Sequence, residues 1–127
     1  MPTNMAAILI VAPAGRLRDS LRVLLKSTRP LIPIEWADQI STALPRLIGS
    51  PPTVVLVDAA SLDRQAWQSL EHLLHYYPQH RCVVLAHSAE HQSQAQAAGA
   101  QAIWLDGMTS ASLFAVMEGS VEKEKGT

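Results

Sequence analysis

Asp58 carries the clearest chemical signal in the sequence. Four consecutive apolar residues, 54–57, lead directly into this one carboxylate, and two alanines follow it. A charged group at the end of a buried run is costly unless water reaches it or another group pairs with it. We therefore expect Asp58 either to do chemistry at the mouth of a strand or to accept hydrogen bonds from the loop that follows. Asp106 also ends an apolar run, and it could form an acid-sensitive carboxylate pair with Asp58 if the fold brings them together.

Two pairs of histidines have spacings that can present both rings on one helix face. They are His87 with His91 and His72 with His75. A structural zinc site needs four protein donors, and a catalytic site needs three with a water. No HExxH or CxxC motif accompanies the pairs, so we interpret these residues as surface histidines.

The elements that would position these side chains can be located from hydrophobic periodicity. Short apolar runs predict strands at residues 7–11, 32–36, 53–57, 81–86 and 101–105. Apolar residues at spacings of three and four predict helices at residues 16–26, 40–48, 63–77, 89–98 and 109–117. Asp38, Asp63 and Thr109 are candidate N-caps, and Gly99 is a candidate C-cap.

Strands that alternate with helices predict an α/β fold. We expect a doubly wound five-stranded parallel sheet with helices on both faces, in which ligands bind at the carboxyl ends of the strands. The residues at these ends are Ala12 and Pro13, Asp58, Ala86 and His87, and Asp106. We expect one domain over residues 1–120 and a charged tail or linker at residues 121–127.

Composition limits the classes of partner. The 127 residues include 10 Lys and Arg and 11 Asp and Glu, which argues against a dedicated nucleic-acid surface. Five basic residues between Arg16 and Arg29 nevertheless form a stripe that is either a solvated helix face or a partner surface. Cys82 is the single cysteine, so a cytoplasmic setting is expected. No apolar run approaches the length that spans a membrane.

A phosphoryl acceptor at Asp58 would need particular neighbours. A divalent cation must offset the repulsion between the carboxylate and the phosphoryl group, and Mg²⁺ prefers carboxylate oxygens. The neighbouring strand end offers Ala12 and Pro13, whose side chains contain no such ligand. The last strand ends in Asp106 instead of a cation, and the fourth ends in Ala86 instead of a hydroxyl.

Residues 6–120 resemble the receiver domain of bacterial two-component response regulators, and they look closest to the NarL/FixJ type. The similarity lies in residues 8–21, residues 54–58 and residues 98–106. This resemblance implies a CheY-like fold with Asp58 at the position of the phospho-acceptor.

The family's other functional positions hold residues of a different chemistry. The acidic pair falls on Ala12 and Pro13, the hydroxyl on Ala86, the switch aromatic on Ile103 and the lysine on Asp106. The resemblance therefore implies a degenerate receiver, or pseudo-receiver, that keeps the fold and signals without the usual phosphorylation. We expect no cofactor, and weak or absent binding of Mg²⁺.

The leading hypothesis is an interaction module of signal transduction that acts by protein–protein contact and is not an enzyme. The resemblance implies partner contacts, or a homodimer, through the last strand and its flanking helices, without membrane or nucleic-acid binding by this chain. Two alternatives stay open: a working phosphorelay receiver phosphorylated on Asp58, and a small flavodoxin-like enzyme or cofactor binder. The second of these lacks a phosphate-cradling G-x-G-x-x-G loop, because residues 12–16 contain a single glycine.

Overall fold

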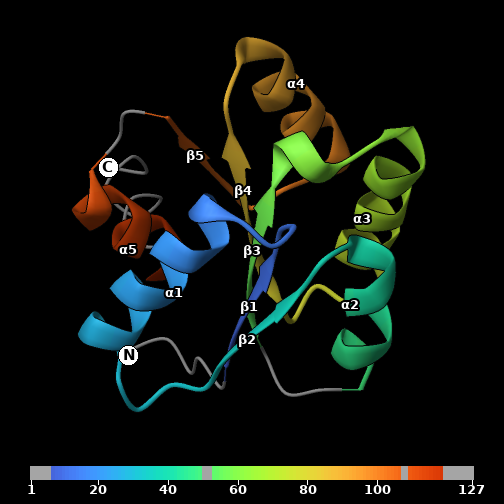
Figure 1. Ribbon diagram of the computed structural model, residues 1–127. Helices are drawn as coiled ribbons and strands as arrows, with labels where there is room; N and C mark the ends of the chain where they lie inside the picture. Colours follow the sequence, from blue (N-terminus) through green and yellow to red (C-terminus); the bar gives the residue numbers. More distant parts are fainter. Residues whose placement is uncertain (1–6, 50–52, 107–108, 119–127) are drawn as a thin grey trace, which may run out of the picture.

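A five-stranded parallel sheet forms the middle layer of the protein (Figure 1). The computed structural model describes residues 7–49, 53–106 and 109–118, and the predicted tail at residues 121–127 lies outside them. The strands are β1 (Ile8–Val11), β2 (Ile34–Ala37), β3 (Val54–Asp58), β4 (Arg81–Ala86) and β5 (Ala102–Leu105), in the order β2-β1-β3-β4-β5. Every pairing between neighbours is parallel. The predicted sheet is therefore confirmed, with β2 and β5 at its edges.

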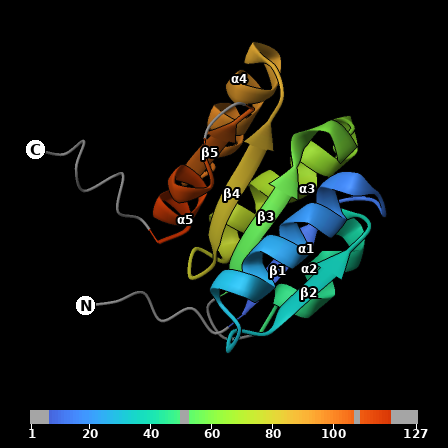
Figure 2. The same cartoon turned by 60° about the vertical axis from the view of Figure 1, so that its left-hand side comes forward.

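Helices cover both faces of the sheet, as Figures 1 and 2 show. They are α1 (Arg16–Thr28), α2 (Ile40–Leu47), α3 (Arg64–Tyr76), α4 (Ala89–Ala98) and α5 (Ser110–Glu118), and a 3-10 turn, η1 (Ala59–Ser61), follows β3. α1 and α5 lie on one face, and α2, α3 and α4 lie on the other. In the described part of the chain, no helix is long and apolar enough to cross a membrane.

The central strand β3 illustrates why the apolar runs are continuous. Val54 and Leu56 face the core under α1 and α5, whereas Val55 and Val57 face the core under α2 and α3. All four side chains are at most 2% exposed, and burying each contributes about 1.5–3 kcal/mol. Because both faces of this strand are covered, a polar residue is tolerated only where the strand reaches the edge of the sheet.

Most of the predicted helix boundaries are confirmed by the capping contacts. Asp63 accepts a hydrogen bond from the Ala66 N–H at 2.8 Å, and the Thr109 hydroxyl accepts one from the Ser112 N–H at 3.1 Å. Gly99 ends α4 with a φ of 91°, a left-handed conformation that glycine adopts without a steric penalty.

The prediction that Asp38 caps α2 is wrong. Gln39 takes the N-cap position, and no side chain caps this helix. The Asp38 carboxylate instead accepts a hydrogen bond from Arg18 Nη1 at 2.7 Å. A charge-assisted contact of this kind is stronger than a neutral cap, so it determines where the carboxylate points.

His80 connects three elements at the amino-terminal edge of the sheet. It directly precedes β4, and its side chain is almost fully buried. Its Nδ1 accepts a hydrogen bond from the Thr53 N–H at 3.1 Å, before β3, and its Nε2 donates to the carbonyl of Leu47 at 2.8 Å, at the end of α2. One ring nitrogen accepts and the other donates, so the imidazole is neutral in this position.

Replacing His80 by alanine should lower the free energy of unfolding by about 2–4 kcal/mol, because it leaves a cavity and two unsatisfied backbone groups. Urea denaturation measures the loss. The matched control is His75→Ala on the exposed side of α3, which should change the stability by no more than about 0.5 kcal/mol. Equal losses in the two variants would contradict a structural role for His80.

Candidate functional site

The ends of β3, β4 and β5 bring the predicted site residues to one edge of the sheet. Asp58 is the last residue of β3, and its side chain is 11% exposed. Ala86 is the last residue of β4, and its carbonyl accepts a hydrogen bond from the Asp106 N–H at 3.2 Å. Asp106 follows β5 directly, with a side chain that is 62% exposed.

His87 lies between the two carboxylates. It is the first residue after β4, the strand that separates β3 from β5. Its Nε2 is 2.7 Å from Oδ1 of Asp58, and its Nδ1 is 2.8 Å from Oδ1 of Asp106. We name this arrangement of Asp58, His87 and Asp106 the histidine bridge. It joins the ends of three strands through a single side chain.

The geometry of the histidine bridge determines its protonation state. An ionised carboxylate only accepts hydrogen bonds, whereas a neutral imidazole has one N–H to donate. With a carboxylate oxygen facing each ring nitrogen of His87, both nitrogens must carry a proton. The ring is therefore an imidazolium when both carboxylates are ionised, and both contacts are charge-assisted hydrogen bonds.

The pKa of His87 is raised above its ordinary value of 6.5. Partial burial is the largest single influence and acts in the opposite direction, because it disfavours the charged ring. The hydrogen bonds to Asp58 and Asp106, together with the negative charges of these carboxylates, outweigh it. The His87 side chain keeps 29% of its surface exposed, so water screens part of this attraction.

Asp58 also holds the turn that follows it. Its Oδ1 accepts a hydrogen bond from the Ala60 N–H at 3.1 Å, and its carbonyl accepts one from the Ser61 hydroxyl at 2.7 Å. The interpretation of Asp58 as a carboxylate that accepts from its own loop is therefore confirmed. This role and the contact with His87 use the same carboxylate oxygen.

The end of β1 supplies no acid to this edge. Ala12 is buried, Pro13 is exposed, and the nearby charged pair is Arg18 with Asp38. Arg18 Nη1 also donates a long hydrogen bond, 3.4 Å, to the Ala12 carbonyl. Among the residues that the structure describes, no group of three or more His, Cys, Asp or Glu is placed to hold a metal ion.

Solved structures of response regulators match this architecture, although no protein-family model and no curated protein sequence matches the chain. A CheY-like receiver domain protein from Methanospirillum hungatei JF-1 has a TM-score of 0.73 at 21% identity, covering 98% of this chain and 100% of that one. A LuxR family DNA-binding response regulator from Silicibacter pomeroyi has a TM-score of 0.71 at 22% identity, covering 91% of this chain and 93% of its own. Full-length FixJ from B. japonicum has a TM-score of 0.76 at 18% identity, covering 95% of this chain but 60% of FixJ.

The chain has the fold of a receiver domain. All three identities are below 25%, so the likeness concerns the backbone and its topology. The receiver fold places Asp58 at the carboxyl end of the central strand β3.

One aliphatic and one aromatic side chain of β5 pack on opposite faces of the sheet. Ile103, at the position implied for the switch aromatic, packs partly buried against the core under α2 and α3. Trp104 packs against the other core, and its indole N–H donates to the Thr109 carbonyl at 3.3 Å. Trp104 therefore connects β5 with the beginning of α5.

Part of the basic stripe is used within the receiver fold. The guanidinium groups of Arg18 and Arg22 lie 5.7 and 5.1 Å from the centre of the Trp36 ring, and that of Arg29 lies 5.0 Å from the Phe114 ring. Such cation–π contacts contribute about 0.5–1 kcal/mol each at exposed sites. The use of the stripe as a partner surface stays a prediction.

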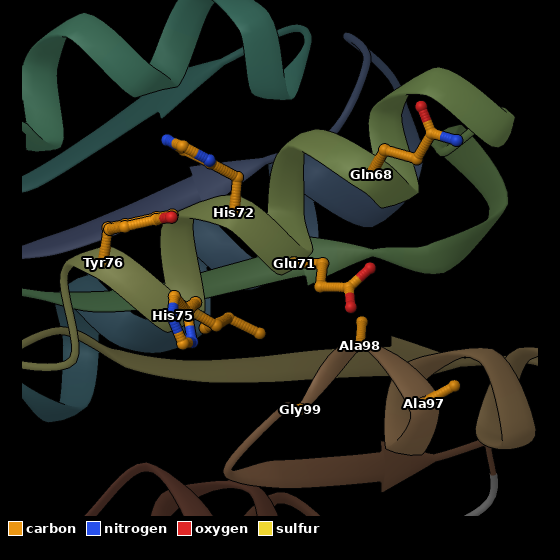
Figure 3. A pocket seen from close by; sticks show the side chains of 9 residues that line it. Gln68, Glu71, His72, His75, Tyr76, Ala97, Ala98 and Gly99 are labelled. Carbon is orange, nitrogen blue, oxygen red and sulfur yellow. The ribbon is translucent and has the colours of Figure 1, made fainter.

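A cavity of about 570 Å³ lies away from the histidine bridge, between α3 and the end of α4 (Figure 3). Figure 3 shows His72 and His75 leaving α3 in different directions, so the two rings do not converge on one ligand position. Both rings contact Tyr76, with centroid distances of 4.4 and 4.7 Å. The cavity therefore has histidine and aromatic groups in its wall but no gathered set of catalytic or metal-binding groups.

The contacts of His87 with the two acids are not predicted from the sequence. Its spacing indicates a surface histidine paired with His91, and the backbone N–H of His87 does donate to His91 Nδ1 at 3.1 Å. The additional signal is the position of His87 at the end of the strand that lies between the strands of Asp58 and Asp106. The observed strand order places this imidazole between the two carboxylates.

The histidine bridge should make stability depend on pH. The folded-state pKa of His87 is raised above the 6.5 of the unfolded chain, so its contribution is fully present below about pH 6.5. This contribution is then lost as the pH rises through the folded-state pKa. The difference in unfolding free energy between wild type and His87→Gln should be about 1 kcal/mol at about pH 6, where carboxylates are ionised, and urea denaturation should show it shrink as the pH is raised. His80 is present in both proteins, so its contribution to the pH dependence of stability cancels in the comparison. A difference in unfolding free energy that grows with pH would contradict the histidine bridge.

Proposed function

We propose that this chain is an atypical receiver domain that acts by protein–protein contact and is not phosphorylated by the usual Mg²⁺-dependent route. The observation that carries the proposal is the imidazolium of His87 on the carboxylate of Asp58, 2.7 Å away. A carboxylate that attacks a phosphoryl group needs a cation that neutralises the incoming charge. Here the positive partner is a side chain of the protein itself.

The charges around Asp58 also oppose phosphoryl transfer. At the position implied for the family's lysine, Asp106 brings a negative charge to the edge where phosphoryl oxygens would lie. A contact between two unit charges at about 4 Å, with an effective dielectric near 20, is worth roughly 4 kcal/mol. Replacing the attraction of a lysine by the repulsion of an aspartate changes the interaction energy by about twice that amount. Solvent reduces this figure because the Asp106 side chain is 62% exposed. The remaining effect still has the wrong sign for catalysis.

The partner surface that we propose is the edge strand β5 with the helices α4 and α5 that flank it. An edge strand has backbone N–H and C=O groups that no neighbouring strand pairs. Trp104 adds an aromatic group to this side of the sheet. A second copy of the chain is the occupant that the resemblance to receiver domains favours.

A working phosphorelay receiver remains the second candidate, because Asp58 stands at the carboxyl end of the central strand, where a phospho-acceptor would be. The small-enzyme alternative has less support. The predicted site residues Asp58 and Asp106 are engaged with His87 in the histidine bridge, an arrangement that favours a structural or switching role.

Acetyl phosphate with millimolar Mg²⁺ should leave Asp58 unmodified, because His87 already pairs with its carboxylate, Asp106 adds a negative charge, and no acid stands at positions 12 and 13 to bind the cation. Intact-mass spectrometry checks this, and beryllofluoride with amide chemical shifts gives a second measurement around Asp58, Ala86 and Asp106. Stoichiometric labelling that disappears in Asp58→Asn would instead support the phosphorelay candidate.

Size-exclusion chromatography with light scattering tests the second-copy partner. The mass should rise with concentration from 13.8 kDa towards twice that value. The rise should persist without acetyl phosphate, since the proposed contact needs no phosphoryl group. A mass that stays at the monomer value at every concentration would exclude the homodimer and restrict the partner to another protein.

A further inference from the structure

The histidine bridge can hold both of its contacts only while His87 carries two ring protons. A neutral ring has one N–H, so it can donate to Asp58 or to Asp106 but not to both. The nitrogen that loses its proton would direct a lone pair at a carboxylate oxygen 2.7 or 2.8 Å away. That contact is repulsive, so loss of one proton must open one arm of the bridge.

Burial determines which arm opens. The Asp58 side chain is 11% exposed, whereas that of Asp106 is 62% exposed. A buried carboxylate that loses a donor pays a desolvation penalty, but an exposed one exchanges the donor for water. The neutral ring should therefore keep its hydrogen bond to Asp58 and release Asp106.

Release of Asp106 affects the side of the fold where we place the partner. Asp106 directly follows β5, and its N–H donates to the carbonyl of Ala86 at the end of β4. Two residues before it, Trp104 connects β5 to Thr109 at the start of α5. When it is closed, the bridge thus connects the end of β5 to Asp58 at the centre of the sheet.

The groups that face His87 come from three elements. Asp58 at the end of β3 and Asp106 after β5 are the acids, and both favour the charged ring. From α4, the His91 ring lies 5.8 Å away, and its Nδ1 accepts a hydrogen bond from the His87 N–H. The two contacts of the histidine bridge do not involve His91. The turn η1 contributes only Ala59, Ala60 and Ser61, which bear no charge.

The helix next to His87 is weakly anchored. In α4 the buried residues are Ala95 and Ala98, whereas α3 buries Leu70, Leu73 and Leu74. Two alanines bury much less apolar surface than three leucines. The first turn of α4 is held by local contacts, among them the Ser88 hydroxyl that accepts from the His91 N–H at 3.1 Å. The region around His87 can therefore adjust without disrupting either core.

We propose that a proton on His87 is the switching ligand of this domain, closing the histidine bridge when bound and freeing Asp106 at the end of β5 when it leaves. This inference rests on the proposed function, because the proton on His87 would change the state of the partner surface in place of a phosphoryl group on Asp58. It gives the partner surface a pH-dependent state. The pKa of His87 is raised above 6.5 by its two acidic neighbours, so the change should occur above that pH.

The test is an NMR titration of the full chain labelled with ¹⁵N and ¹³C, between about pH 5.5 and 9. The ring signals of His87 should change from imidazolium to neutral imidazole with a midpoint above 6.5. The Asp106 amide and the Trp104 indole N–H should shift with the same midpoint. Above it, hydrogen exchange at the Asp106 amide should be at least about tenfold faster, after correction for its intrinsic pH dependence.

Variants separate the switch from a general effect of pH. His87→Gln should abolish the pH dependence at Asp106 and Trp104, and Asp106→Asn should lower the midpoint of His87 while its contact with Asp58 persists. The matched control His75→Gln, on α3, should leave both reporters unchanged. Signals of Asp106 and Trp104 that do not change with pH, or that change with a midpoint different from that of His87, would overturn the switch.

Treating the same samples with acetyl phosphate separates the two proposals. An unphosphorylated domain whose Asp106 and Trp104 signals do not respond to pH would overturn the switch alone. Phosphorylation of Asp58 would overturn the proposed function, even if His87 titrates with the expected midpoint.

Discussion

The arrangement of the functional edge depends on one constraint, which is that carboxylates accept hydrogen bonds and cannot donate them. Asp58 and Asp106 end two strands that β4 separates, and His87 follows β4 with one ring nitrogen directed at each acid. The ring must be charged to satisfy both contacts. A single proton therefore determines whether side chains, in addition to the backbone pairing, connect the three strand ends.

Two histidines join strands in this fold, and their protonation differs because their partners differ. His80, at the amino-terminal edge, faces a backbone N–H on one side and a carbonyl on the other, so it is neutral and almost fully buried. His87, at the carboxyl-terminal edge, faces two acids and keeps part of its surface in water. Burying the charge of His87 as deeply as His80 would incur a large desolvation cost. The first histidine can therefore serve only stability, whereas the second can respond to its surroundings.

The fold could be predicted from the sequence because the apolar periodicities are local and consistent with one another. The runs at residues 54–57 and 81–86 could only be strands covered on both faces, and caps such as Asp63 and Gly99 defined the helix ends. The side-chain partners were harder to predict. Asp38 pairs with Arg18 instead of capping α2, and His87 forms hydrogen bonds with residues that lie 29 and 19 positions away in the chain. Such contacts follow from strand order and not from spacing along the sequence, so His91, four residues away, was the more visible partner.

The absence of acids at positions 12 and 13 and the presence of His87 can be explained together. A strand-end carboxylate as buried as Asp58 needs a positive partner. Where acids gather a metal ion, that ion supplies the charge and leaves the carboxylate open to an incoming group. Here positions 12 and 13 hold Ala and Pro, and the charge comes from an imidazolium that contacts Oδ1 of the carboxylate. A phosphoryl group would bring between one and two further negative charges to an edge whose two acids and one imidazolium already sum to a negative charge. Pairing Asp58 with His87 and phosphorylating it are therefore competing uses of the same carboxylate, and the first is the one for which this sequence provides the residues.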